Sequence, residues 1–330
     1  MSKPAPLIVE LLALPSLDPG SLMVRPAAPW PADLGNAPRI ASLLGDLTHA
    51  LPCWIHPDDP WSGEALGNLL SAGCQALPPG SRIHQSSLPG ALPPPPGIDW
   101  LCGDWYLSPP KAAGGSVAMS RSLALRLMQL VAADADTCDI EAIFRQDPVL
   151  AYHLLRLVNS LGMSTGRRVT SFSQAILILG RQQLKRWINL MLFAANRGDH
   201  RAPMLLARVS VRARSTELLA RSAGLERSVQ EQAFTAGLFS LLGTLFGSPL
   251  EDLVASLNLT DNTRDAVLHR KQSIGKMLNA IEAAEKQDAV TLVGELDALG
   301  ISIEDFNCAT LEAHLWMADV VHDTREKRYG

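Results

Sequence analysis

The side chains that could hold a metal ion or activate a nucleophile are scattered along this chain. None of its eight histidines belongs to an H-E-x-x-H or H-x-x-x-H pattern, which would place two imidazoles on one helix face. No two of its five cysteines form a C-x-x-C pair, so neither a zinc ribbon nor a disulfide framework is predicted. The sequence also lacks a phosphate loop, a dinucleotide fingerprint and a G-x-S-x-G turn. Common hydrolase and nucleotide-binding motifs are therefore excluded.

Arginine is concentrated in the middle of the chain. Residues 156–221 hold twelve basic residues against two acidic ones, a net charge of +10, and eleven of the twelve are arginine. Residues 251–330 hold eight basic and fifteen acidic residues, a net charge of −7. The basic helices could pack beside the acidic C-terminal helices, dock an acidic protein, or bind phosphate in a nucleotide messenger or nucleic acid. Few aromatic side chains accompany these arginines, which disfavours nucleic acid.

The first 110 residues differ in pattern from the rest. Proline and glycine are frequent there, and short apolar segments alternate with helical ones, as in a parallel sheet with crossover helices. We expect a small α/β domain over residues 1–110, bounded by Pro109-Pro110 and Gly114-Gly115. The expected strands are Leu7 to Leu14, Cys53 to His56, Arg82 to Gln85 and Asp99 to Leu107, and the expected helices are Pro38 to Leu51 and Ser62 to Ala76.

Residues 111–330 show a helical pattern throughout, and no strand pattern competes with it. Asp147-Pro148 is a typical helix start, and Gly180 is a natural left-handed terminator. The predicted fold class is therefore mainly α, an all-helical C-terminal domain preceded by the small α/β domain. The expected helices include Val117 to Val131, Arg181 to Asn196, Pro203 to Ala223, Val229 to Phe246, Thr263 to Ala284, Leu292 to Leu299, Ile303 to Asn307 and Thr310 to Val321.

One segment approaches the length of a membrane span. Residues 233–250 carry no charge, but they include glycine, serine and proline, which favours a buried helix that neighbouring helices approach closely. The N-terminal apolar segment is interrupted by Pro4, Pro6 and Glu10, unlike a signal peptide. Together with the unpaired cysteines, this predicts a cytoplasmic protein without a membrane span.

The order of motifs in residues 141–192 resembles the opening half of HDOD domains, which share the scaffold of HD phosphohydrolases. Asp147-Pro148 is followed by a Leu-Leu-Arg-Leu helix, Asn159-Ser160, a basic loop and Leu179-Gly180. Farther on, Ala236-Gly237-Leu238-Phe239 is similar to the approach to the name-giving His-Asp position. The resemblance implies an HDOD domain over residues 111–330.

The N-terminal part resembles, more weakly, the end of an EAL domain, the barrel that hydrolyses cyclic di-guanylate. Residues 103–109 (GDWYLSP) are similar to its last strand, and Glu10-Leu11-Leu12 is similar to its acidic strand. Asp58-Asp59 is the only paired acid in this part, and no other acidic metal ligand of the family is matched. We expect a shortened, degenerate EAL-like domain, with an unrelated α/β extension as the alternative.

The resemblance implies that the HD metal site is lost. Ser240 and Leu241 occupy the position of the His-Asp pair, and neither a hydroxyl nor an alkyl group replaces those metal ligands. Upstream, Arg212, Arg214 and Ser215 stand where another histidine is expected, and a guanidinium repels a metal cation. We therefore predict no catalytic residue, no metal, no cofactor and no enzymatic activity.

The resulting hypothesis is a non-catalytic signalling protein in a cyclic di-guanylate-linked circuit, whose HDOD domain binds a protein partner or a ligand. One alternative is a metal-dependent HD-type phosphohydrolase or phosphodiesterase. Another is a nucleic-acid-binding regulator that uses the arginine-rich helices. The candidate partner or ligand surface consists of Asp147, Pro148, Asn159, Ser160, Arg167, Arg168, Arg181, Lys185 and Arg186.

Overall fold

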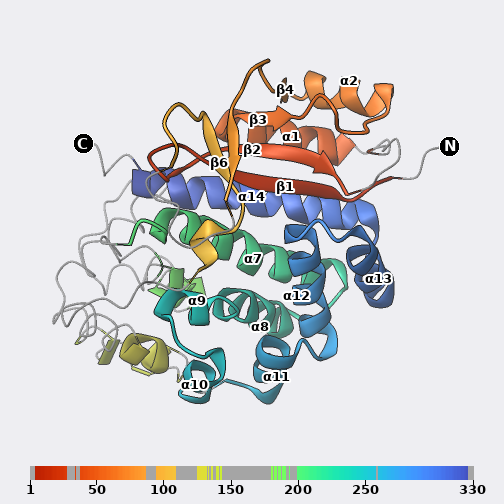
Figure 1. Ribbon diagram of the computed structural model, residues 1–330. Helices are drawn as coiled ribbons and strands as arrows, with labels where there is room; N and C mark the ends of the chain where they lie inside the picture. Colours follow the sequence, from red (N-terminus) through yellow and green to blue (C-terminus); the bar gives the residue numbers. More distant parts are fainter. Residues whose placement is uncertain are drawn as a thin grey trace.

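A computed structural model gives the structure of the chain (Figure 1). It describes residues 4–27, 34, 38–86, 94–108, 125–131, 199–257 and 259–325. Between these ranges it also describes positions 133, 135–136, 139–140, 142, 180, 182–183, 185–186, 188–190 and 193. Side chains are described as far as residue 321.

The N-terminal part is a six-stranded mixed sheet with strand order β4-β3-β2-β1-β6-β5. β1 is antiparallel to both β2 and β6, whereas the other neighbouring pairs are parallel. The prediction of a purely parallel sheet is therefore wrong. The strands are β1 (Leu7–Ala13), β2 (Pro19–Pro26), β3 (Cys53–Ile55), β4 (Gln75–Ala76), β5 (Ile83–Gln85) and β6 (Trp100–Cys102), with the helices α1 (Pro38–Ala50) and α2 (Gly63–Ser71) and the 3-10 turn η1 (Trp105–Leu107).

Two local features explain where the sequence prediction fails in this part. Leu14 and Leu17 close a tight turn by backbone hydrogen bonds, and Leu17 adopts a φ of 72°, so β1 folds back directly into the unpredicted strand β2. Helix α2 ends at Ser71, earlier than expected, because Gly73 adopts a φ of 97°. The chain then enters β4, which lies inside the segment predicted to be helical.

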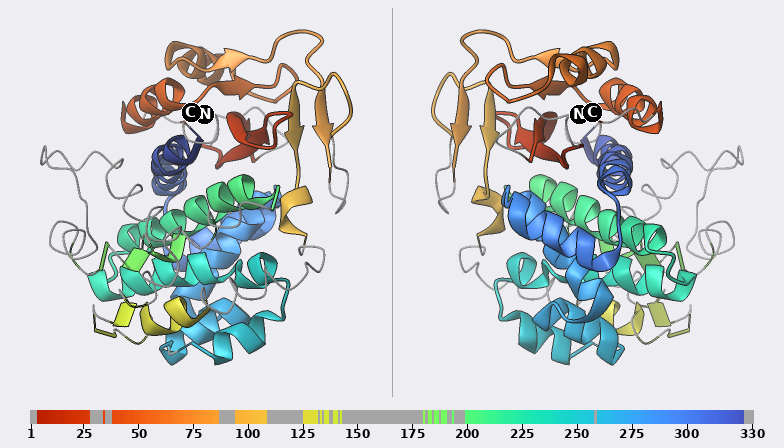
Figure 2. Two further views of the ribbon diagram at one scale, coloured as in Figure 1. Left: turned by 90° about the vertical axis from the view of Figure 1, so that its left-hand side faces the viewer. Right: turned by 90° about the vertical axis from the view of Figure 1, so that its right-hand side faces the viewer.

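The sheet curls strongly. Trp54 on β3 and Trp100 on β6 lie three strand spacings apart in the order, about 14 Å in a flat sheet. Their ring centroids nevertheless approach to 5.2 Å. The concave face thus encloses a small core of its own, made of Leu12, Met23, Leu77 and Cys102. Figure 2 shows β5 and β6 standing almost upright beside the rest of the sheet.

The helical part contains eight fully described helices. They are α7 (Ala202–Ser222), α8 (Arg227–Phe239), α9 (Leu242–Phe246), α10 (Leu250–Ala255), α11 (Asp261–His269), α12 (Gln272–Glu285), α13 (Ala289–Leu299) and α14 (Ile303–Arg325). Residues 125–131 are helical as well, as are the described positions from 139 to 193.

Three helix boundaries differ from the prediction. The expected helix at residues 229–246 breaks at Ser240–Leu241 into α8 and α9. The expected helix at 263–284 breaks at Arg270, which ends α11 in a left-handed conformation with a φ of 54°. The two short helices expected after residue 302 form the single helix α14. Local sequence signals mark helix ends poorly where tertiary packing decides.

The close approach of α7 and α8 depends on a glycine, as the small residues in this segment predict. A Cβ atom at Gly237 would lie 2.6 Å from Ala213 Cα and 2.8 Å from the Arg212 carbonyl oxygen. Because the obstructing atoms are backbone, neither helix could yield without moving as a whole. No described helix is long and apolar enough to cross a membrane. Residues 233–250 are divided among α8, α9 and the start of α10.

The sheet is docked on the helical part through β1 and α14 (Figures 1 and 2). Asn307 of α14 is fully buried, accepts a hydrogen bond from the Leu7 amide at 2.7 Å and donates one to the Ala5 carbonyl at 3.0 Å. One hydrophobic core runs from β1 and α1 through α14 to α7, α8 and α12. The predicted mainly helical fold is confirmed, and the domain boundary at residues 110/111 stays a prediction.

Candidate functional site

Five strands end at the same edge of the sheet. Because β1 is antiparallel to β2 and β6, the strands β2 to β6 all run in one direction. Ligands of open α/β sheets bind outside such carboxyl ends. Arg25 lies near the end of β2, Asp59 follows β3 and Asp104 follows β6, while Glu10 lies on the neighbouring β1. Charged side chains from four parts of the sheet therefore converge on one edge.

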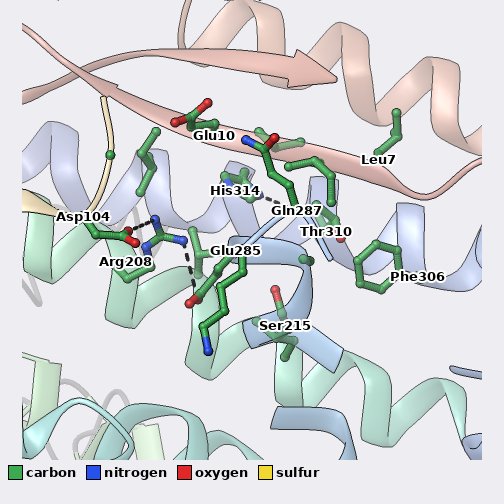
Figure 3. A pocket seen from close by; sticks show the side chains of 18 of the residues that line it. Leu7, Glu10, Asp104, Arg208, Ser215, Glu285, Gln287, Phe306, Thr310 and His314 are labelled. Carbon is green, nitrogen blue, oxygen red and sulfur yellow. Dashed lines mark hydrogen bonds and ion pairs between the residues drawn. The ribbon is translucent and has the colours of Figure 1, made fainter. Parts of the chain in front are cut away.

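A cavity of about 390 Å³, which we call the edge pocket, lies beside this edge (Figure 3). Its volume falls within the range of small-molecule sites, roughly 300 to 1,000 Å³. It lies between β1, the segment after β6, and the helices α7, α12 and α14. The polar side chains that line it include Glu10, Gln85, Asp104, Arg208, Glu285, Gln287 and His314.

Arg208 provides the main positive charge of the edge pocket, and its side chain is only 12% exposed. Its Nε donates a hydrogen bond of 2.8 Å to the hydroxyl of Tyr106. Its terminal nitrogens lie 3.8 Å from Asp104 Oδ1 and 3.6 Å from Glu285 Oε1, longer than hydrogen bonds. The guanidinium is thus fixed in place while its terminal N–H groups keep the capacity to donate to a ligand oxygen.

The pKa values of two carboxyl groups at the edge pocket are shifted in opposite directions. Burial raises the pKa of Glu10, although Arg25 and Arg208 pull it down. Burial would also raise the pKa of Glu285, but Arg212 and Arg208 hold it below its ordinary value. Neighbouring carboxyl groups in such different environments are typical of acid–base chemistry.

The carboxyl edge also holds two buried polar atoms that form an ion pair but no hydrogen bond. Arg25 and Asp59 approach to 3.8 Å, yet Arg25 Nε and Asp59 Oδ2 are buried without a hydrogen-bond partner. Burial raises the pKa of Asp59. Neither residue lines the edge pocket. Because buried polar groups are nearly always paired, these two atoms indicate capacity to bind water or another polar group.

Behind the edge pocket, ion pairs join α7 to α12. Arg212 is 5% exposed, and its Nε donates to Glu285 Oε1 at 3.0 Å. Its Nη1 lies 3.2 Å from Glu282 Oε1 and 2.9 Å from Ser240 Oγ. Arg270 donates to Glu282 at 2.7 Å. The alternating charges therefore form one network from Arg208 to the corner between α11 and α12.

Ser240 and Leu241, at the predicted HD position, have structural roles. Ser240 is the C-cap of α8, and its Oγ donates to the Gly237 carbonyl at 2.7 Å and accepts from Arg212. Leu241 is buried and apolar. These residues do not fit the divalent metal that an HD-type scaffold implies. The Ser240 hydroxyl already forms hydrogen bonds to Gly237 and Arg212, and the positive charge of Arg212 beside it would repel a cation. Within the described ranges, no group of three or more His, Cys, Asp or Glu side chains could hold a metal ion.

Most of the predicted partner surface lies outside the described residues. This holds for Asp147, Pro148, Asn159, Ser160, Arg167, Arg168 and Arg181. Arg186 is described, donates to Glu217 at 2.6 Å and stacks on the ring of Phe234 at 4.5 Å. Lys185 is described and half-buried. The role of this surface stays a prediction.

Part of the basic charge is paired with acidic residues of α12 and α14. Arg208 and Arg212 pair with Glu285, and Arg221 donates to Glu312 of α14 at 3.0 Å. The structure thus supports the interpretation that basic helices pack against the acidic C-terminal ones. For these three arginines it does not favour a nucleic-acid surface.

Sequence reasoning missed the edge pocket. Glu10 and Asp104 belong to the two segments that resemble parts of an EAL domain, but the sequence indicates a site role for neither of them, nor for Arg208 or Glu285. The available signal is an acid shortly after the predicted strand Cys53 to His56, at Asp59, whereas Asp104 falls inside the predicted strand Asp99 to Leu107, which in the structure ends earlier, at Cys102. The curl of the sheet and the approach of α7 could not be read from spacing.

Comparison with known proteins identifies the helical part. Residues 118–278 match the model of the HDOD domain, which confirms the prediction of an HDOD domain in this part of the chain. The match ends within α12. The degenerate EAL-like character of residues 1–110 lies outside it and stays a prediction.

Two curated relatives match the chain in part. Cyclic di-GMP phosphodiesterase CdgJ of Vibrio cholerae is 29% identical over 226 residues, 68% of this chain and 52% of that protein. The uncharacterized protein YuxH of Bacillus subtilis is 30% identical over 145 residues, 43% of this chain and 35% of that protein. The chain thus corresponds to about half the length of the first relative and about a third of the second.

The Vibrio relative is named as an enzyme, and this contradicts the prediction that the chain is not one. A crystal structure of a provisionally assigned phosphohydrolase from Shewanella amazonensis covers 62% of this chain and 93% of its own length. It is 16% identical, with a TM-score of 0.42, and a similarity of this size establishes neither a shared fold nor a shared activity.

Proposed function

We propose that this protein cleaves a phosphodiester bond of a cyclic dinucleotide in a cyclic di-guanylate-linked circuit, and that the scissile phosphate binds in the edge pocket. The convergence of Arg208, Glu10 and Asp104 at the carboxyl edge of the sheet is the observation that supports it most. The HDOD domain and the relative named a cyclic di-GMP phosphodiesterase support the substrate class.

Each of the three side chains has a role that its environment suits. The terminal N–H groups of Arg208 donate to the non-bridging phosphate oxygens, whose negative charge grows in the transition state. Asp104, whose side chain is 56% exposed, accepts a proton from an attacking water. Glu10, whose pKa burial raises, donates its proton to the leaving sugar oxygen.

The proposed reaction is a hydrolysis without a change in oxidation state. The water oxygen forms a bond to phosphorus, and the bond from phosphorus to the sugar oxygen breaks. One proton moves from the water to Asp104, and one moves from Glu10 to the leaving sugar oxygen. A linear dinucleotide is released, with Asp104 protonated and Glu10 ionised. No step runs through a metal at Ser240–Leu241, because those residues do not fit one.

The curled sheet is a shortened EAL-like domain, supported by the placement of the charged residues at the carboxyl ends of its strands. The protein works in the cytoplasm, supported by the four described cysteines, which are all buried free thiols.

The test uses the full chain and cyclic di-GMP, with the linear product quantified by chromatography. We expect Asp104→Asn and Arg208→Lys each to lower kcat by roughly 100-fold, the size of one acid–base or charge-stabilising contribution. Glu64→Gln on the exposed first turn of α2 is the matched control and should leave kcat unchanged. Absence of product from the unaltered protein, or equal loss in the control, would refute the proposal.

A further inference from the structure

A second cavity, of about 430 Å³, lies on the helical part, away from the edge pocket. We call it the arginine groove. It is formed by Arg186, by Arg214 and Glu217 of α7, and by Arg227 and Glu231 of α8. None of these five residues lines the edge pocket. The two cavities therefore share no lining residue, and variants can test each one separately.

The arginine groove carries an excess of positive charge. Arg186 and Arg214 share a single carboxylate, since Arg186 donates to Glu217 Oε1 at 2.6 Å and Arg214 donates to Oε2 at 2.7 Å. Arg227 lies 3.7 Å from Glu231 and is 86% exposed, so that pair contributes little. Three guanidinium groups against two carboxylates leave one positive charge, and Arg227 is available to an incoming anion.

Two of the guanidinium groups are held in position before any ligand arrives. Arg186 stacks on the ring of Phe234, which itself contacts Trp316 of α14 edge-on at 5.9 Å. Arg214 is anchored by Glu217, yet its Nε is buried without a hydrogen-bond partner. Docking of a ligand against Arg186 and Arg214 therefore costs these two side chains little conformational entropy.

We infer that the arginine groove docks an acidic peptide segment of a protein partner. Carboxylates of such a segment accept hydrogen bonds from Arg227 and Arg214, as guanidinium groups favour. A small nucleotide is the poorer occupant, because small ligands are mostly enclosed by their sites, whereas Arg227 projects into solvent. The binding is electrostatic and weakens as salt rises.

The test measures binding of a fluorescein-labelled hexaglutamate peptide to the full chain by fluorescence anisotropy at low ionic strength. Arg227→Gln and Arg214→Gln should each weaken binding by roughly tenfold, about the contribution of one charge-assisted hydrogen bond. Arg264→Gln on α11 is the matched control, since Arg264 is an exposed arginine paired with Asp261 outside the groove. Circular dichroism of each variant checks that the fold is intact.

Hydrogen exchange on the same samples places the peptide. Added peptide should slow amide exchange in the first turns of α8, around Arg227 to Glu231, and this effect should disappear in Arg227→Gln. No binding to hexaglutamate, or equal loss in Arg264→Gln, would overturn the inference. Complete competition by inorganic phosphate at the concentration of the peptide would overturn it too, in favour of a simple anion site.

Discussion

The sheet part and the helical part of this molecule treat polar groups differently. Among the described residues, nine buried side-chain polar atoms lack a hydrogen-bond partner, and six of them belong to residues 21–105. In the helical part, by contrast, Arg212, Glu285 and Glu282 satisfy one another in a continuous network. The sheet part thus keeps buried donors and acceptors without hydrogen-bond partners, while α7 and α12 use similar groups to hold themselves together.

This difference distinguishes charged groups that stabilise the fold from charged groups that remain able to bind a substrate. A buried ion pair that is fully hydrogen-bonded fixes the arrangement of helices and has little left to offer a substrate. Buried groups without partners lower stability, and they persist where a ligand or a reaction uses them. Tests of stability are therefore aimed at the helical network. Tests of activity are aimed at the edge pocket, where the terminal nitrogens of Arg208 lie beyond hydrogen-bond distance of Asp104 and Glu285.

Removal of Arg212 should have the largest effect on stability. Arg212→Met removes the closest partner of Glu285 and one of the two arginine partners of Glu282 in a buried setting, and we expect it to lower the free energy of unfolding by about 3 to 5 kcal/mol. Urea denaturation followed by circular dichroism measures the change. Arg264→Met, at an exposed ion pair, should cost about 0.5 kcal/mol. Equal effects of the two variants would mean that the buried network stabilises the fold no more than an exposed ion pair does.

Acidification should destabilise the contact between β1 and α14. Burial lowers the pKa of His314 to about 4, below the 6.5 expected when the chain is unfolded. The unfolded chain therefore binds more protons between these values, so stability is complete above pH 6.5 and falls as pH drops towards 4. The loss is about 3 kcal/mol at most. His314→Gln should flatten this part of the curve, and an unchanged curve would show that the histidine is not responsible.

Crowding between α7 and α8 should lower the free energy of unfolding by nearly as much. Gly237→Ala places a methyl group against backbone atoms of α7 and should cost about 2 to 3 kcal/mol. Gly294→Ala on α13 meets nothing within 4 Å and should stabilise by about 0.5 to 1 kcal/mol, because alanine favours a helix more than glycine does. Thermal unfolding of both variants checks the opposite signs, and a shared sign would contradict the packing described.

Loss of the hydrogen bonds between Asn307 and the start of β1 should have a smaller effect. Asn307→Leu leaves the Leu7 amide and the Ala5 carbonyl buried without a partner, and we expect a cost of about 2 kcal/mol. Proteolysis near the N-terminus should accelerate in parallel. A loss of stability without faster N-terminal cleavage would mean that Asn307 does not hold β1.

Much of the fold could be predicted from sequence. Helices α1, α7 and α13 and strands β1, β3 and β5 lie where apolar periodicity and capping signals placed them. The unpredicted strand β2 depends on a tight turn at Leu14–Asp18 that carries no glycine in its left-handed position, which Leu17 fills. The break at Arg270 is similar, because an arginine occupies a conformation normally left to glycine or asparagine.

The candidate site was harder to predict than the fold. Its residues come from β1, the loop after β6, α7 and α12, which are separated by up to 275 positions between Glu10 and Glu285. Sequence patterns report local periodicity, and they carry no information on which helix covers which strand end. The arginine cluster was visible in the composition, but which arginines pair internally and which face the arginine groove depends on tertiary contacts.

Hydrolysis of cyclic di-GMP by the unaltered protein and by Glu10→Gln tests the central claim most directly. The amide keeps the shape of Glu10 but has no proton to give the leaving sugar oxygen. The account predicts a linear dinucleotide from the unaltered protein and a roughly 100-fold slower rate from the variant, with binding of the cyclic dinucleotide retained. Equal rates for the two proteins, or no linear product from either, would contradict it.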